Sequence, residues 1–315
     1  MLNARRMVPP SLCLLLAAVL LFSGGAGCTR TEEPPAPKPA VEPVRGKALL
    51  IGLIPEQSLF KQMERYEPLM NYISRKTGIE IRLIVLPRYG NIISNFRSAD
   101  MDGAFFGSFT YALAHEKLGV EVLARPDGLD GISTYHGLMF VRKDSGIRSV
   151  EQMQDKRFAF VDRATTAGYL LPLAYFRQHN KNYRSFLREY YFAGTHEDVI
   201  YDVLNGKADI GAAKNTVFDR LAKSDKRIRE ELVVLAKSPA VPENALAVRK
   251  GLESTLRSRL QNELLNMDRD PEGARVLKAF GARRFILTRN SDYQAVYDYA
   301  RDSNLDLATY DYLND

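Results

Sequence analysis

The stretch Phe158-Ala-Phe-Val-Asp-Arg-Ala-Thr-Thr-Ala-Gly-Tyr-Leu-Leu-Pro172 indicates both a fold class and a kind of site. It begins as an apolar run typical of a buried strand and ends in the pattern of an amphipathic helix. Thr165, Thr166 and Gly168 lie between the two. The first turn of a helix leaves about four backbone N–H groups unpartnered at its partly positive end. This turn therefore suits an oxyanion as well as it suits an ordinary helix cap.

Short apolar runs and stretches of helical periodicity alternate on both sides of this segment, which predicts an α/β protein with mostly parallel strands. The expected strands are residues 48–54, 79–86, 103–106, 138–141, 158–161, around 191, 208–213, 232–236 and 245–248. The expected helices are residues 63–77, 91–96, a segment from 108, 168–179, 198–204, 252–267, 271–280 and 293–301. The last three come without enough strands for a third domain, so we expect them to cover the first.

The first residues have the pattern of a secretory signal. Two arginines precede an apolar run at residues 12–22, about half the length that spans a bilayer. The segment Gly25-Ala-Gly-Cys28 then resembles a bacterial lipobox, which predicts a lipoprotein signal peptide at residues 1–28 and a lipid on Cys28. Because Gly25 stands where a lipobox usually has an aliphatic residue, a plain cleavage site with a leftover thiol is the alternative.

The composition of the rest of the chain limits the kinds of protein that it can be. Residues 29–46 are mostly Pro, Glu, Lys, Ala and Thr, so we expect a stiff linker, with the disordered tail of a secreted enzyme as the alternative. Both cysteines, Cys13 and Cys28, belong to the signal, which predicts a mature fold without disulfides or thiolate metal sites. The formal charge of +6 is mild and no basic run is present, so we expect no nucleic-acid partner.

Motifs of catalysis are absent from the sequence, and a few polar residues stand at expected strand ends instead. The sequence has no nucleophile elbow, P-loop, dinucleotide fingerprint or zinc-type His-Glu-x-x-His helix, so we expect no enzyme, cofactor or metal. His196 lies between a strand and a helix, at the sheet edge where ligands commonly bind. Tyr89 and Tyr135 occupy similar edges, and Ser108 starts a second helix. Packing or capping is the alternative for each of them.

Together these segments resemble the phosphonate-binding-protein-like family of type II periplasmic binding proteins, which serve ABC importers of phosphate, phosphite and phosphonate. The resemblance covers nearly the whole mature chain and implies two Rossmann-like α/β lobes joined by two hinge strands. The boundaries implied are residues 47–140 plus 240–315 for lobe 1 and 141–239 for lobe 2. The segments that carry the resemblance are residues 87–89, 102–111, 135–146, 158–172 and 238–242.

The resemblance also implies the ligand site. In this family a Ser-Thr-Ser-Gly turn at a helix start holds the oxyanion, and two tyrosines and often a histidine complete the pocket. The present chain departs at Ala167, where a hydroxyl is missing, and at Gly137, where relatives often carry serine. The residues expected to bind ligand are Tyr89, Ser108, Tyr135, Thr165, Thr166, Ala167, Gly168, His196, Asn215 and Asn244.

The size of the ligand follows from two further segments. Family members that bind an aminoalkyl phosphonate need carboxylates for its ammonium group. The corresponding segments here are Lys214-Asn-Thr-Val217 and Pro242-Glu-Asn244, in which only Glu243 could serve and Lys214 would repel a cation. We therefore expect a compact phosphorus oxyanion: phosphate, phosphite or a small phosphonate.

The resemblance implies a mechanism and partners. A ligand held by both lobes favours the closed state, with hinges near residues 135–141 and 236–245, and a membrane permease recognises that state. We expect a monomer in the periplasm, held at a membrane by its lipid. The alternatives are a sensor of the same fold that feeds a kinase or chemoreceptor, a structural lipoprotein without ligand, and a periplasmic enzyme.

Overall fold

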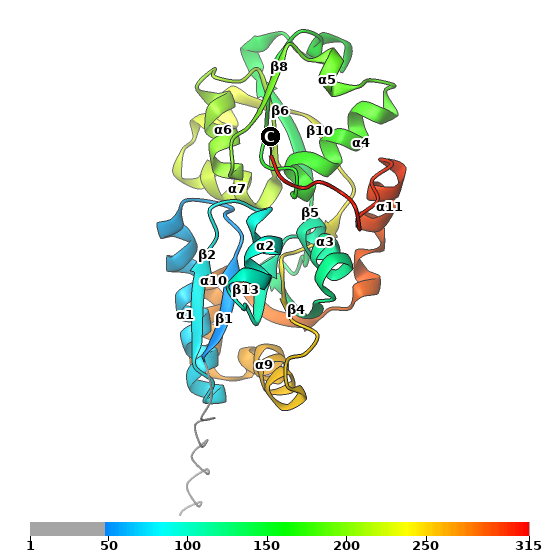
Figure 1. Cartoon of the computed structure of the whole chain (residues 1–315). Coiled ribbons are helices and arrows are strands. Elements are labelled where there is room, and N and C mark those ends of the chain that lie inside the picture. The colour runs from blue at the N-terminus through cyan, green and yellow to red at the C-terminus, as the bar shows by residue number, and fades with distance from the viewer. Residues whose placement is uncertain (1–47, 315) are drawn as a thin grey trace, which may run out of the picture. The chain divides into compact units, whose positions relative to one another are not determined.

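The computed structural model describes residues 48–314, and Figure 1 shows them as two sheets, each with helices around it. The predicted signal peptide, Cys28 and the linker lie outside these residues. Within the described part, no helix is long and apolar enough to cross a membrane.

The first lobe is built on a six-stranded sheet with the order β13-β4-β12-β3-β1-β2. Strands β2, β1 and β3 are parallel, whereas β12 and β13 run antiparallel to their neighbours. The strands are β1 (Leu49–Leu53), β2 (Ile81–Val85), β3 (Gly103–Phe106), β4 (Glu121–Gly128), β12 (Ala245–Val248) and β13 (Ala282–Leu287). The helices are α1 (Leu59–Thr77), α2 (Asn91–Ser98), α3 (Ser108–Leu118), α9 (Ser254–Asn266) and α10 (Pro271–Phe280), with short turns at Met267–Arg269 and Asn290–Tyr293.

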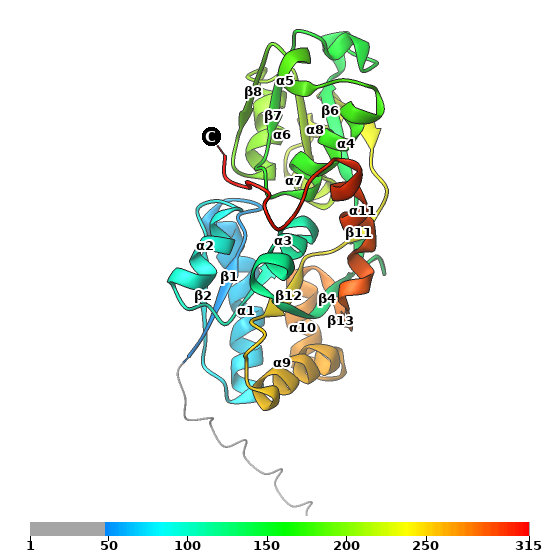
Figure 2. The same cartoon turned by 45° about the vertical axis from the view of Figure 1, so that its right-hand side comes forward.

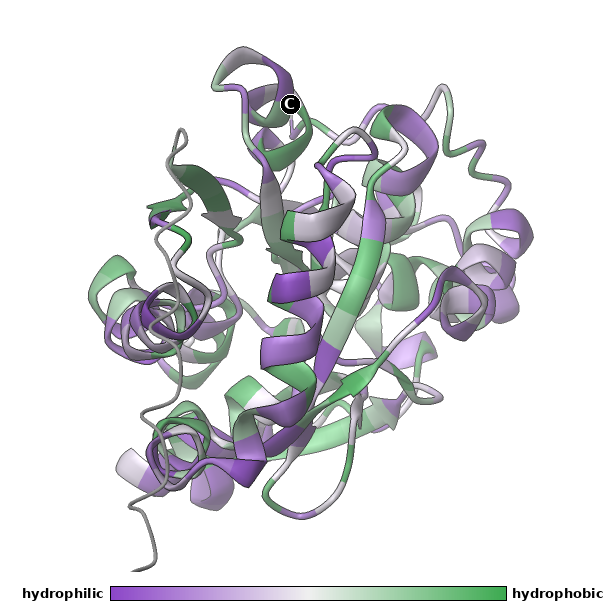
Figure 3. Ribbon diagram, turned by 90° about the horizontal axis from the view of Figure 1, so that it is seen from below, coloured by the Kyte–Doolittle hydropathy of each residue, from purple (hydrophilic) through white to green (hydrophobic). Residues whose placement is uncertain are grey.

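Successive residues of β3 contact different helices. The ring of Phe105 meets Tyr66 of α1 with centroids 4.9 Å apart, and the ring of Phe106 meets Phe96 of α2 at 6.1 Å. Because successive side chains of a strand point to opposite faces, helices cover this sheet on both sides, as parallel strands require. Figure 3 agrees, since its strands are mostly hydrophobic while its helices alternate between hydrophilic and hydrophobic residues.

The second lobe is built on a five-stranded sheet with the order β10-β6-β9-β7-β8. Strand β7 is parallel to β8 and β9, and β6 runs antiparallel to β9 and β10. The strands are β6 (Gly137–Arg142), β7 (Arg157–Phe160), β8 (Glu189–Phe192), β9 (Ile210–Lys214) and β10 (Leu232–Lys237). The helices are α4 (Leu171–Gln178), α5 (Tyr183–Phe186), α6 (His196–Leu204), α7 (Asn215–Ser224) and α8 (Arg227–Glu231), with short turns at Lys143–Ser145, Glu151–Met153 and Thr166–Leu170.

Two segments pass between the sheets side by side. Strand β5 (Thr134–Tyr135) pairs antiparallel with β11 (Val241–Pro242) and forms a two-stranded ribbon. Just beyond it, the backbone N–H of Gly137 donates to the Ser238 hydroxyl at 2.9 Å. These are the two crossing segments expected near residues 135–141 and 236–245.

The C-terminal residues make a third connection between the lobes. Helix α11 (Gln294–Asp302) packs against both α3 and α4. The chain then runs on to the second lobe (Figure 2), where the Tyr310 hydroxyl donates to the carbonyl oxygen of Arg163 at 3.0 Å. The side chain of Asn314 donates to Asp162 at 2.9 Å. This segment therefore spans both lobes instead of covering the first alone.

The predicted two-lobed α/β fold is confirmed, and all the predicted strands occur within two residues of their expected limits. The pattern missed β4, which ends in Arg-Pro-Asp-Gly, and β13, whose Arg283 and Arg284 are half exposed and pair with Asp127. Helices α9 and α10 pack against α1, as expected for the first lobe. The lobe boundaries at residues 140 and 240 stay a prediction, and β6 begins three residues before the first of them.

Candidate functional site

A small cavity lies where the lobes meet. Its volume is about 10 Å³, roughly the minimum for one water molecule, so a tetrahedral oxyanion enters only when the surrounding side chains move apart. Six residues predicted to bind ligand line it: Tyr89, Tyr135, Thr165, Thr166, His196 and Asn244. The rest of the lining is Ile54, Glu56, Gly107, Thr110 and Lys214.

The two threonines lie at a helix start, as predicted. Thr165 has an extended backbone, with φ −98° and ψ 145°, and a π-helical turn follows it and continues into α4. Its hydroxyl donates to the carbonyl oxygen of Asp162 at 2.7 Å. The Thr166 hydroxyl oxygen accepts from the backbone N–H of Phe109 at 2.8 Å. Because Phe109 is in the first turn of α3, Thr166 joins a helix start in one lobe to a helix start in the other.

Two buried donors at the cavity have no partner. The Tyr89 hydroxyl and the Asn244 side-chain N–H₂ group form no hydrogen bond within residues 48–314, although both residues are at most 5% exposed. Buried polar groups are nearly always hydrogen-bonded, because leaving one unpaired costs about 1–3 kcal/mol. The amide group can only donate and the phenol is able to donate, so an oxygen-rich anion satisfies both.

Tyr135 adds another buried hydroxyl. Burial raises the pKa of its phenol above the usual value, although the Lys214 charge and the hydroxyls of Thr166 and Ser108 oppose that rise. The phenol therefore keeps its proton and acts as a donor. Ser108 itself is turned to the ribbon between the lobes, since its hydroxyl donates to the carbonyl oxygen of Pro242 at 2.5 Å.

His196 begins α6 and is held in one tautomer. Its Nδ1 accepts from the backbone N–H of Lys214 at 3.2 Å, and its ring meets Tyr89 edge-on at 5.9 Å. Burial lowers the pKa of His196 to about 3, so the ring is neutral. With Nδ1 accepting, the hydrogen is on Nε2, which makes the imidazole a further neutral donor.

Lys214 ends β9 and projects into a cluster of acceptors. Its Nζ lies 2.9 Å from Glu56 Oε1 and 2.6 Å from Glu243 Oε2. Burial opposes the charge on Lys214, but Glu243 and Glu56 outweigh it and raise its pKa above the usual value. For Glu56, burial acts upward, but Lys214, Arg65 and Arg220 outweigh it and hold its pKa well below the usual range. The ammonium and the Glu56 carboxylate are therefore both charged.

Residues 51–293 match the family described as ABC transporter, phosphonate, periplasmic substrate-binding protein. The chain belongs to this family. The resemblance inferred from the sequence is thereby confirmed.

Individual members of the phosphonate-binding family are similar over most of the chain. The phosphonates-binding periplasmic protein of Escherichia coli (strain K12) is 28% identical over 262 residues, which cover 82% of this chain and 77% of that protein. A binding-protein component of an ABC phosphonate transporter from Pseudomonas aeruginosa has a similar crystal structure, with a TM-score of 0.76, 23% identity and coverage of 82% and 86%. The structure of PhnD1 from Prochlorococcus marinus (MIT 9301) with methylphosphonate gives a TM-score of 0.74, 22% identity and coverage of 82% and 98%. These two structures show that the fold is shared.

The other residues predicted for this family's site lie outside the lining of the cavity. Asn215 uses its side-chain oxygen to accept from the backbone N–H of His136 at 2.8 Å. Gly168 is a packing position, because a Cβ there would lie 2.4 Å from the side chain of Val161. Ala167 and Ser108 likewise stand behind the lining, and contact of these four residues with ligand stays a prediction.

The two departures from the family pattern are linked in space. A Cβ added to Gly137 would lie 3.2 Å from the Cα of Ala167 and 3.0 Å from the side chain of Leu171. Strand β6 therefore packs directly on the turn that carries the two threonines. A serine at position 137 would push against that turn, so glycine at this position is explained by packing.

Sequence reasoning missed Glu56, whose carboxylate is 158 residues away in sequence from the lysine that it binds. It lies in the loop after β1, at the carboxyl end of a parallel strand, where ligands of open α/β sheets commonly bind. That position was the one available signal. The stretch Pro55-Glu-Gln57 otherwise has the composition of any exposed loop.

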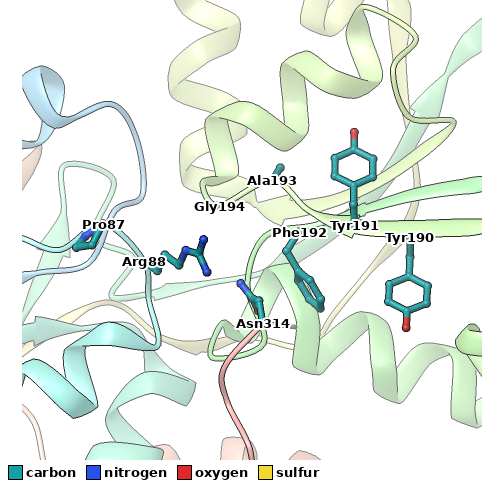
Figure 4. Close-up of a pocket in the computed structure, with 8 residues that line it drawn as sticks. All are labelled: Pro87, Arg88, Tyr190, Tyr191, Phe192, Ala193, Gly194 and Asn314. Atoms are coloured by element: carbon teal, nitrogen blue, oxygen red, sulfur yellow. The ribbon is translucent and has the colours of Figure 1, made fainter.

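A larger pocket has a volume of about 660 Å³. Some of its lining residues are close in sequence to those of the cavity, and one of them, Arg88, is positively charged. Figure 4 shows the guanidinium group of Arg88 directed towards Asn314 in this pocket. Arg88 immediately precedes Tyr89, and Gly194 comes two residues before His196. The cation favours the approach of an anion to this part of the molecule. Its lining is Pro87, Arg88, Tyr190, Tyr191, Phe192, Ala193, Gly194 and Asn314.

Proposed function

We propose that this protein is the extracytoplasmic substrate-binding component of an ABC importer and captures a small phosphorus oxyanion between its lobes. The candidate ligands are phosphate, phosphite and phosphonate. The observation that carries the proposal is the pair of buried, unpartnered donors at the cavity, on Tyr89 and Asn244. The helix start at Thr166 and the neutral imidazole of His196 supply further donors around the same space.

Binding drives closure because the donors come from both lobes. Tyr89 follows β2 of the first sheet, whereas Thr166 and His196 follow β7 and β8 of the second. An anion that contacts all three stabilises the state in which they are close together. Two further contacts join the lobes at the rim: Lys61 with Glu197 at 2.6 Å and Arg220 with Gln57 at 2.8 Å. The closed state is the form that a permease would recognise.

The mature protein in this proposal is a periplasmic monomer, held at a membrane by a lipid on Cys28 and spaced from it by residues 29–46. It binds its ligand without transforming it. This part of the proposal is supported by the state of His196, whose Nδ1 is engaged with the backbone and whose pKa is too low for a general base near neutral pH.

Isothermal titration calorimetry with phosphate, phosphite and methylphosphonate tests the proposal. We expect binding of at least one of them, and at least a tenfold loss of affinity in the double variant Thr165→Ala, Thr166→Ala, because one hydrogen bond to an anion contributes about 1.5–3 kcal/mol. Thr309→Ala is the matched control, since this exposed threonine bonds only to Asp306 nearby in sequence. Unchanged affinity in the double variant would refute the assignment of the threonines, and no binding of any oxyanion would refute the function.

A further inference from the structure

The ammonium group of Lys214 is enclosed by acceptors on every N–H bond. An ammonium has three N–H donors. Two of them reach Glu56 and Glu243, at 2.9 and 2.6 Å, and the third reaches the side-chain oxygen of Asn244 at 3.1 Å. The Nζ atom also lies 4.4 Å from the ring centroid of Tyr135. No donor of Lys214 is left for an anion in the cavity.

The acceptors belong to the first lobe and the connecting ribbon, while the lysine comes from the second lobe. Glu56 follows β1, and Glu243 and Asn244 follow β11, whereas Lys214 is the last residue of β9. The side chains are buried, with exposed fractions of 4% for Lys214, 2% for Glu56 and 14% for Glu243. One lobe therefore presents an ammonium site, and a side chain of the other lobe fills it.

The chemistry of this group of acceptors is that of organic ammonium recognition. Two carboxylates supply charge-assisted hydrogen bonds, and the face of Tyr135 supplies a cation–π contact. Both kinds of contact select a positive charge on a small tetrahedral nitrogen. The acceptors reach the cavity itself, because Glu56, Asn244 and Tyr135 all line it together with the Thr166 turn. An anion site and an ammonium site are thus adjacent.

We propose that Lys214 determines specificity: its ammonium group occupies the position where an amine on the ligand would bind, so the pocket accepts phosphorus oxyanions with an uncharged substituent or none and rejects aminoalkyl phosphonates. This inference rests on the proposed function. Lys214 acts by filling the ammonium site and by forming ion pairs with Glu56 and Glu243. It does not contact the anion.

The wild-type protein tests this with ligand pairs of equal size. Ethylphosphonate and aminomethylphosphonate differ in a methyl against an ammonium group, as do propylphosphonate and 2-aminoethylphosphonate. We expect the amine of each pair to bind at least tenfold more weakly in calorimetry at neutral pH. Equal or tighter binding of the amines would overturn the role of Lys214 and leave the proposed function intact. Failure of phosphate, phosphite and every phosphonate to bind would overturn both.

The variant Lys214→Ala tests the same idea by a gain of binding. It removes the ammonium group that binds both Glu56 and Glu243, so we expect a less stable protein that binds 2-aminoethylphosphonate at least tenfold more tightly, relative to propylphosphonate, than the wild type does. The amine should also raise its melting temperature more than propylphosphonate does. An unchanged ratio in folded protein would contradict the proposal.

Two further variants keep the test decisive. The triple variant Lys214→Met, Glu56→Gln, Glu243→Gln removes the lysine together with the two carboxylates that it binds. Arg65 and Arg220 lose the charge of Glu56, so we expect a less stable protein in which the preference for amines does not appear. A gain of amine binding there would show that space alone, and not the carboxylates, selects the amine, which contradicts the proposal. Lys207→Ala is the matched control, because this exposed lysine pairs with Asp202 away from the cavity. It should leave both ligand ratios unchanged. If Lys214→Ala does not fold, the wild-type pairs decide.

Discussion

Replacing Tyr89 with phenylalanine should weaken ligand binding without weakening the fold. The hydroxyl that is removed is buried and has no hydrogen-bond partner within residues 48–314. The ligand-free protein therefore loses no hydrogen bond and is relieved of an unpaired polar group, which costs about 1–3 kcal/mol. We expect its free energy of unfolding to stay the same or to rise by up to about that amount. A hydrogen bond to an anion contributes about 1.5–3 kcal/mol, so affinity should fall roughly 10- to 150-fold.

Two measurements on one preparation test this prediction. Urea unfolding of the ligand-free protein gives the stability, and calorimetry with the best-bound oxyanion gives the affinity. Tyr72→Phe is the matched control, because the Tyr72 hydroxyl donates to Asp270 at 2.8 Å, away from the cavity. It should lower stability and leave affinity unchanged. If Tyr89→Phe instead behaves like this control, the hydroxyl is structural and our reasoning about the site is wrong.

Three other changes have defined outcomes. Glu197→Gln removes the ion pair with Lys61 between the lobes, and since exposed pairs contribute about 0–1 kcal/mol, affinity should fall no more than about fivefold, with a smaller effect in about 1 M NaCl. Burial lowers the pKa of His196 from 6.5 to about 3. The contribution of the neutral ring to stability is therefore complete above pH 6.5 and is lost as the pH falls towards 3. In urea titrations over that range, the free energy of unfolding of His196→Asn should fall less with decreasing pH than that of the wild type. Gly168→Ala brings a Cβ to 2.4 Å from Val161 and should cost about 1–3 kcal/mol, seen as a lower melting temperature, together with weaker oxyanion binding.

Strands β3 and β13 show which parts of the fold were predictable from the sequence and which were not. Strand β3 is buried along its whole length, so its apolar run alone identifies it. Strand β13 forms one edge of the sheet and exposes Arg283 and Arg284, whose charges hide the strand pattern. These arginines are accommodated by pairing with the buried Asp127 of β4. That compensation is a tertiary contact, and no local pattern predicts it.

The functional site also has one part that the sequence predicts and one part that it does not. The threonine turn has a local signature, because a strand, two hydroxyl residues and a helix start follow one another in sequence. The charge of the pocket has no local signature in the sequence. From the sequence, Lys214 appears as a cation facing the ligand, but in the fold its three donors are all bound to Glu56, Glu243 and Asn244. Whether a buried lysine attracts or ignores an anion depends on partners that the sequence places far away.

The contacts already present between the lobes set a limit on affinity. The N–H of Phe109, a natural donor for an anion at the start of α3, is bound to Thr166 of the other lobe. An oxyanion that takes this donor must break that hydrogen bond, so its net gain is the difference between the two contacts. The unpartnered groups of Tyr89 and Asn244 have no such competitor. They can therefore contribute their full hydrogen-bond energy to the closed, liganded state. The balance between donors that are free for the ligand and donors that must first break a hydrogen bond decides how far the ligand shifts the protein towards closure.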